Sequence, residues 1–246
     1  MRPLICNPSP RDIPEFLELT EQLNKDYDIL QAKYMPQPQA YNKLREYFLD
    51  HKEYDTMILF ADDLIINRAG LDTLLEFHKY HPEDVISGIC NFDMYRNIHR
   101  YCFRVVGDHG RYPNKFFLEE YLNEWKAVPK YAGRYRVEFN GFACCIITRR
   151  IIEMIPFRFE IQNGGNVDQF FADDCRANDI DVLVDITVEF QHLAYRTKSN
   201  ILECSGLGIK EPELVFLERG DSGKKEVYIL SKSRTDRSSS SSTCHC

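Results

Sequence analysis

Residues 55–67 read Asp55-Thr-Met-Ile-Leu-Phe-Ala-Asp62-Asp63-Leu-Ile-Ile-Asn67, and this stretch decides the expected fold. The run Thr56–Ala61 is short, continuous and free of Gly and Pro. Such a run is typical of a central strand that is covered on both faces. It ends in two adjacent acids, and an isolated buried charge is costly, so carboxylates at the rim of a buried sheet need a partner.

The two acids predict a ligand site at the end of this strand. In open α/β sheets, ligands bind at the carboxyl ends of the strands. We therefore expect a divalent cation at Asp62 and Asp63, with a negatively charged substrate on its other side. The same residues would also suit the start of the following helix, since Asp is a favoured N-cap. This segment alone leaves both interpretations open.

The composition is that of an ordinary globular protein. The chain has 246 residues, of which 43% are hydrophobic and 28% charged, enough for one large domain with a full core. No apolar stretch approaches the roughly 18 residues needed to cross a bilayer, and the N-terminus lacks the apolar region of a signal peptide. The net charge of −7 argues against a nucleic-acid binder. We expect a cytoplasmic protein without a transmembrane segment, with peripheral attachment to a membrane left open.

The nine cysteines do not form a disulfide framework. Their number is odd, and Cys6 and the adjacent Cys144 and Cys145 sit among apolar neighbours, where a free thiol behaves as a small hydrophobic group. Without a secretion signal, reduced thiols are expected. Cys244 and Cys246 flank a histidine after a Ser run, but a zinc site needs two properly spaced ligand pairs.

Strand-like and helix-like patterns alternate along the first third of the chain. This alternation predicts an α/β fold with a mostly parallel central sheet and helices on both faces. The expected strands besides the one above are 2–7, 27–34 and 84–92, and the expected helices are 14–23, 40–51 and 71–80. On the last of these helices, His78 and His81 are expected at the surface. Regular structure resumes with 135–148, a helix at 149–155, a helix at 167–178 and strands at 180–185 and 187–190.

The remaining segments suggest a catalytic domain with two additions. Residues 93–134 are rich in aromatic residues, Arg and Asn without a clean period, which indicates either an excursion that builds a substrate surface or an aromatic subcore. We expect the main domain at 1–206 and an appended hairpin at 207–230. The Ser-rich tail at 231–246 is expected to be disordered.

Three features now follow one another in chain order: Asp62-Asp63 at a strand end, the segment Asn140-Gly-Phe-Ala143 with Asp168 in a later helix start, and His192 at the end of a late strand. This order resembles the GT-A-fold glycosyltransferases, in the family-two-like branch that uses nucleotide sugars. In that family, a buried strand ends in Asp-x-Asp, whose last acid coordinates Mn²⁺ or Mg²⁺. A later acid pair opens a helix and supplies the catalytic base, and a histidine can complete the metal site.

The resemblance implies a role for each matching residue. Asp63 would be the last acid of the motif and, with His192, a ligand of Mn²⁺ or Mg²⁺. Asp62 would contact the nucleotide or the metal, and Gly141 would belong to the nucleotide-sugar site. Asp168 would be the general base.

The resemblance also suggests where the nucleotide lies, and the sequence departs from the family in two places. Pro8, Arg11 and Asn42 are at positions that would reach the nucleotide, although a surface role is the simpler interpretation of each. Ala61 replaces the first acid of Asp-x-Asp, which weakens the expected nucleotide contact. Val167 replaces the first acid of the later pair, so Asp168 would act alone.

The resemblance implies a metal-dependent glycosyltransferase of the hexosyltransferase type. It would move a sugar from a UDP- or GDP-sugar to a hydroxyl of a glycan, lipid or protein acceptor. A bound divalent cation would neutralise the leaving diphosphate, and a carboxylate opposite the leaving group would take the acceptor proton, with inversion of configuration. Oxygen ligands suit Mg²⁺ or Mn²⁺, and one imidazole favours Mn²⁺.

Three alternatives compete with this interpretation. A catalytically degenerate GT-A-like module that binds sugar or protein would account for Ala61 and Val167. A sugar nucleotidylyltransferase would need a Gly-rich phosphate loop after the first strand, where this chain has Pro8-Ser-Pro-Arg11. A metal-dependent phosphoesterase would need further metal ligands near the first strand, and the sequence shows none there.

Overall fold

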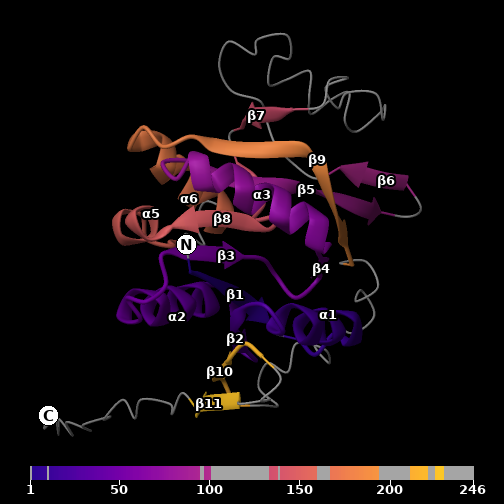
Figure 1. The fold of residues 1–246 in the computed structure, drawn as a ribbon, viewed down its shortest axis with the longest axis vertical. Coiled ribbons are helices and arrows are strands. Elements are labelled where there is room, and N and C mark those ends of the chain that lie inside the picture. Colours follow the sequence, from indigo (N-terminus) through magenta and orange to yellow (C-terminus); the bar gives the residue numbers. More distant parts are fainter. Residues whose placement is uncertain are drawn as a thin grey trace, which may run out of the picture.

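The computed structural model describes residues 2–9, 11–94, 97–100, 133–137, 139–159, 167–193, 211–220 and 225–229. In this part of the chain, one 11-stranded sheet has the strand order β11-β10-β2-β1-β3-β8-β5-β9-β4, with β6 beside β5 and β7 beside β9. Figure 1 shows the strands stacked from β11 at the bottom to β9 and β7 at the top. The strands are β1 (Pro3–Ser9), β2 (Asp28–Lys33), β3 (Thr56–Leu59), β4 (Leu64–Ile65), β5 (Val85–Met94), β6 (Asn97–Arg100), β7 (Arg134–Arg136), β8 (Cys145–Thr148), β9 (Val182–His192), β10 (Glu213–Leu217) and β11 (Lys225–Ile229).

The sheet is mixed rather than simply parallel. β1 runs parallel to β2 and β3, and β5 runs parallel to β9, as expected from the alternating pattern. β8 lies between β3 and β5 and is antiparallel to both, so β3, β5 and β9 all point the same way. A hydrophobic run predicts a buried strand but carries no information on its direction, which is why the sequence did not reveal the reversed strand.

Helices cover both faces of the sheet, as predicted. The helices are α1 (Pro14–Asn24), α2 (Gln37–Asp50), α3 (Arg68–Tyr80), α5 (Arg149–Met154) and α6 (Val167–Ala177). Alternate residues of β1 serve two cores: Leu4 and Cys6 pack with α2, α5 and α6, whereas Ile5 packs with α1 and α3. This division follows from the two-residue period of a strand. No helix in the described part of the chain is long and apolar enough to span a membrane.

The first strand runs further than expected, through Pro8 to Ser9. The sequence predicted an end at Asn7, because proline cannot donate to a ladder. β3 pairs with β1 only as far as Cys6, whereas β2 continues to pair as far as Ser9. One side of β1 therefore carries no ladder at Pro8, and proline is tolerated at such an edge position.

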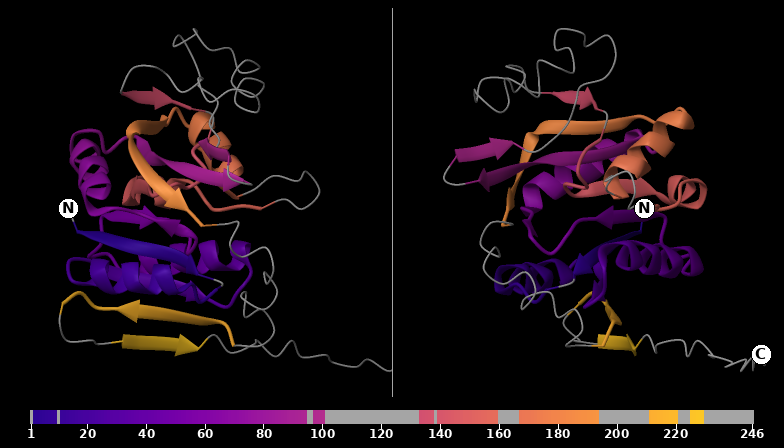
Figure 2. Two further views of the ribbon diagram at one scale, coloured as in Figure 1. Left: turned by 90° about the vertical axis from the view of Figure 1, so that its right-hand side faces the viewer. Right: turned by 180° about the vertical axis from the view of Figure 1, so that it is seen from behind.

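The segment at 213–229 forms an antiparallel hairpin, β10 and β11, and β10 pairs with the edge of β2. Figure 2 shows the hairpin continuing the sheet beyond β2. Two hydrogen bonds anchor the residues that follow β10: Gly220 N donates to Asn24 O over 3.0 Å, and Arg219 N donates to the buried Asp28 over 2.9 Å. The hairpin therefore shares the main sheet. The expected disordered tail at 231–246 and most of the aromatic middle segment lie outside the described residues.

His78 is buried, which corrects the expected surface position. It is 1% exposed, and neither ring nitrogen has a hydrogen-bond partner among the described residues. Burial lowers its pKa to about 4, although Asp55 and Glu83 act in the opposite direction. The spacing Leu71, Leu74, Leu75, His78 follows the buried face of α3, so the helical period was the signal for this position.

We expect His78 to destabilise the protein in mild acid. Above about pH 6.5 the His78 imidazole is neutral in the folded and in the unfolded protein. Between about pH 6.5 and about pH 4, the imidazole takes up a proton only in the unfolded chain. The free energy of unfolding therefore falls by up to about 3 kcal/mol over this range. His78→Leu should remove this part of the decline, measured by urea unfolding at pH 7, 5.5 and 4.5. His81→Leu, at a half-exposed position, is the control and should keep the wild-type decline. If the free energy of unfolding of His78→Leu fell with pH as steeply as that of the wild type, His78 would not be the cause.

Gly88 lets β5 and β9 approach each other where their register shifts. A Cβ atom at this position would lie 2.6 Å from the ring of Phe190 and 2.7 Å from the backbone oxygen of Val188. A Cβ at Gly70 of α3 would also lie 2.9 Å from the Phe190 ring. Phe190 is therefore held between two glycines, two residues before His192.

Gly88→Ala should lower the free energy of unfolding by about 2 kcal/mol, because the added methyl group overpacks against backbone as well as the Phe190 ring. Chemical denaturation measures this difference. Ser87→Ala is the matched control: it removes a buried hydroxyl without a partner in the described structure, so stability should be unchanged or slightly higher. Equal stability of Gly88→Ala and wild type would show that β9 moves aside at no cost.

Candidate functional site

The two acids lie in the turn between β3 and β4, at the carboxyl end of β3. Leu64 N donates to Ala61 O over 3.2 Å, which closes the turn, and Asn7 Nδ2 donates to Phe60 O over 2.9 Å. β4 then pairs with the end of β9, and Leu64 is the register partner of His192. Backbone pairing alone therefore brings His192 beside residues far earlier in the chain.

Asp62 is fully buried and is bound by Arg11. The backbone N–H of Arg11 donates to Asp62 Oδ2 over 2.9 Å, its Nε donates to Oδ1 over 3.1 Å, and its Nη2 also contacts Oδ1. Burial raises the pKa of Asp62 to about 6, although the Arg11 charge opposes this shift. Burial lowers the pKa of Arg11, but the two acids outweigh it and leave that pKa raised. The pair is therefore a fixed structural unit at the strand edge.

Asp63 faces both Arg11 and His192. Its Oδ2 lies 2.8 Å from Arg11 Nη2, and its Oδ1 lies 3.8 Å from His192 Nε2. Burial lowers the pKa of His192; Asp63 opposes this effect and Arg11 adds to it. A lowered pKa favours the neutral imidazole, which is the form that binds metals. The side chain of Asp63 is 15% exposed and that of His192 is 20% exposed, so both reach solvent.

Asp168 lies in the first turn of α6, as predicted. Burial raises its pKa, while hydrogen bonds from its own backbone N–H and that of Gln169 act in the opposite direction. Burial raises the pKa of Tyr41 in α2 well above its ordinary value, and the charges of Asp168 and Asp63 raise it further. The ring of Phe142 packs against both Tyr41 and Phe171, and Phe171 lies three residues after Asp168 in α6.

Gly141 begins a segment of unusual backbone before β8. Gly141, Phe142 and Cys144 have φ angles of 63°, 49° and 58°, in the left-handed region that non-glycine residues rarely adopt. Asn140 holds this segment through a 3.3 Å hydrogen bond from Phe142 N to its side-chain oxygen. The Phe142 ring packs 5.4 Å from the ring of Tyr41. Strained backbone of this kind often accompanies functional sites, and this segment lies beside Tyr41.

The structure thus groups Arg11, Asp62, Asp63 and His192, with Asp168 nearby. Pro8 is buried in β1. Asn42 lies exposed on α2, and no hydrogen bond joins it to this group among the described residues.

The sequence analysis did not predict the buried position of Tyr41 or the ion pair between Arg11 and Asp62. The spacing of Tyr41, Leu44 and Phe48 is that of a buried helical stripe, so periodicity could have placed Tyr41 inward. No local pattern indicates that Arg11 and Asp62, 51 residues apart, form an ion pair. That contact exists because β1 and β3 are neighbours and end at the same edge.

Asp63 and His192 fit a divalent cation as two of its ligands. The Asp62 oxygens are engaged by Arg11, so the described residues at this place offer one carboxylate and one imidazole, and a bound diphosphate or water would have to complete the shell. A different group of potential ligands, His81, Glu83 and Asp84, has its ligand atoms within 4.8 Å of one another, but His81 and Glu83 are exposed. It precedes β5 and so lies at the opposite edge of the sheet.

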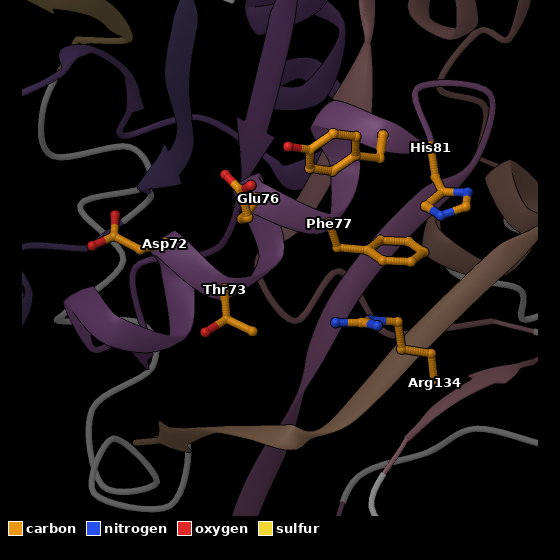
Figure 3. A pocket seen from close by; sticks show the side chains of 7 residues that line it. Asp72, Thr73, Glu76, Phe77, His81 and Arg134 are labelled. Carbon is orange, nitrogen blue, oxygen red and sulfur yellow. The ribbon is translucent and has the colours of Figure 1, made fainter.

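Near that second group, the surface of α3 has an open hollow of about 650 Å³. Figure 3 shows Phe77 between His81 and Arg134. The rings of Phe77 and His81 are stacked 4.4 Å apart, and the Arg134 guanidinium lies 4.2 Å from the Phe77 ring centre. Arg134 also pairs with the buried Asp185 over 3.0 Å, so these side chains are engaged with one another. The hollow does not include any residue predicted to carry function.

Asp62→Asn should lower the free energy of unfolding by about 3 kcal/mol, because it breaks a buried ion pair. Asp63→Asn should cost distinctly less, since Asp63 reaches solvent and Arg11 would retain Asp62. Urea unfolding of both variants measures the difference. Equal losses would contradict the distinction between a buried anchor and an accessible ligand.

No protein-family model matches the chain, and no curated protein matches it. Among solved structures, the chain is similar to the one described as "Crystal Structure of A197 from STIV", with a TM-score of 0.53 and 18% sequence identity. The likeness covers 78% of this chain and 85% of that chain. At this identity it shows a shared α/β fold, with a central sheet and flanking helices.

Proposed function

We propose that the chain is a metal-dependent glycosyltransferase with a GT-A-like fold, which moves a sugar from a nucleotide-diphosphate donor to an acceptor hydroxyl. One observation carries the proposal. Asp63, His192 and Asp168, which are distant in sequence, are brought to one edge of the sheet by β3, β9 and α6. The carboxyl ends of β1, β3, β5 and β9 meet there, which is where α/β sheets bind ligands.

Each residue has a chemical task under this proposal. Asp63 and His192 would hold Mn²⁺ or Mg²⁺, and the bound cation would neutralise the charge that develops on the leaving diphosphate. Arg11 supplies a fixed positive charge beside the same place. Asp168, whose pKa burial raises, would accept the proton of the attacking acceptor hydroxyl. A base opposite the leaving group implies inversion of configuration.

A binding module without catalysis is the second candidate. The observation that favours it is the engagement of Asp62 and Asp63 by Arg11, which neutralises acids that a catalytic site would use for metal. Ala61 and Val167 point in the same direction. A sugar nucleotidylyltransferase is disfavoured because β1 leads into Ser9 and Arg11 rather than a Gly-rich phosphate loop.

A thermal-shift panel with UDP, GDP, CDP and their sugar conjugates, in Mn²⁺ or in EDTA, tests the donor site. A ligand that binds only the folded state raises the melting temperature. We expect a rise with UDP or GDP and their sugars that disappears in EDTA. The absence of any shift would favour the binding module and reject a nucleotide-sugar donor.

Asp168→Asn should reduce sugar transfer by about a hundredfold or more, since it removes general-base catalysis, and should leave nucleotide binding unchanged. Transfer is measured as release of UDP or GDP from the nucleotide sugar that the panel selects, over a set of glycan acceptors. Asp173→Asn, an exposed change on the same helix, is the control and should keep full activity. Full turnover in Asp168→Asn would remove the assigned role.

A further inference from the structure

We propose that Arg11 makes cation binding at Asp63 conditional on an anionic ligand, because its guanidinium already pairs with one oxygen of Asp63, next to the oxygen that faces His192. The inference rests on the proposed function for the assignment of Asp63 and His192 as ligands. It concerns cation binding alone and does not require sugar transfer.

Arg11 makes more contacts with Asp62 than with Asp63. Its hold on Asp62 includes the backbone N–H and Nε, at 2.9 and 3.1 Å, and Asp62 is completely buried. Its hold on Asp63 is one contact, from Nη2 to Oδ2 over 2.8 Å. Arg11 can therefore release Asp63 while its backbone and Nε remain bound to Asp62.

The charges determine what happens when a cation arrives. Two carboxylates and one guanidinium, paired over short distances, leave one net negative charge in this group. A divalent cation bound to Asp63 would lie next to the guanidinium, and two positive charges at such short range repel each other strongly outside bulk water. Cation binding without an anion is therefore opposed by Arg11.

An anionic ligand removes this opposition. A diphosphate accepts hydrogen bonds from a guanidinium and also binds a divalent cation through its oxygens. The Nη2 group that leaves Asp63 would then face phosphate oxygen, while Asp63, His192 and the diphosphate share the cation. Arg11 thus couples cation binding to phosphate binding, and each should tighten the other by the same factor.

The test is a Mn²⁺ titration followed by electron paramagnetic resonance, with inorganic pyrophosphate as the anionic probe. All proteins carry His81→Ala, so that the surface group at the other edge does not contribute. The reference protein should bind Mn²⁺ weakly alone and at least about tenfold more tightly with saturating pyrophosphate, after correction for Mn²⁺ that pyrophosphate holds in solution.

The key variant is Arg11→Gln with Asp62→Asn, which removes both members of the buried pair and so leaves no uncompensated buried charge. It should bind Mn²⁺ alone about tenfold more tightly than the reference, and the tightening by pyrophosphate should be smaller than in the reference. Asp62→Asn alone should weaken Mn²⁺ binding, because Arg11 then has only Asp63 to pair with. Adding Asp63→Asn to the double variant should abolish the gain.

Equal Mn²⁺ affinity in the reference protein and the double variant would overturn the inference. So would a gain that survives Asp63→Asn, since the cation would then be bound elsewhere. A double variant that binds Mn²⁺ more tightly, in a protein that binds no nucleotide sugar, would uphold the role of Arg11 and reject the glycosyltransferase.

Discussion

The ion pair between Arg11 and the fully buried Asp62 is the interaction on which the site depends. A buried carboxylate without a partner would be too costly to keep, and Arg11 supplies that partner through both its backbone and its side chain. The pair joins the end of β1 to the end of β3. It thereby fixes the turn that presents Asp63 to solvent.

The rest of the site follows from strand direction. Because β3 and β9 point the same way, the turn after β3 and the end of β9 meet at one edge, and the short β4 pairs Leu64 with His192. Gly88 and Gly70 leave room for the ring of Phe190, two residues before His192 in β9. The charges of Asp63 and Asp168 both raise the pKa of the buried Tyr41.

Local patterns predicted the elements, and contacts between distant residues account for what they missed. The strand that precedes Asp62, the helix whose first turn contains Asp168 and the helices on both faces follow from hydrophobic period and capping chemistry. The extension of β1 through Pro8 depends on where β3 stops pairing, and the reversal of β8 depends on its neighbours. The Arg11–Asp62 pair depends on two loops meeting, which no single segment encodes. The helical period of α3 indicates a buried position for His78, in contrast to the expected surface position.

The most direct test of this account is anomalous diffraction from crystals grown with Mn²⁺ and pyrophosphate. We expect a manganese peak bound by Asp63 and His192, with the Arg11 guanidinium on Asp62 and phosphate oxygen and no longer on Asp63. A structure in which Arg11 still spans both acids and the manganese lies only at His81, Glu83 and Asp84 would contradict it. The carboxyl edge of the sheet would then be a structural ion-pair network.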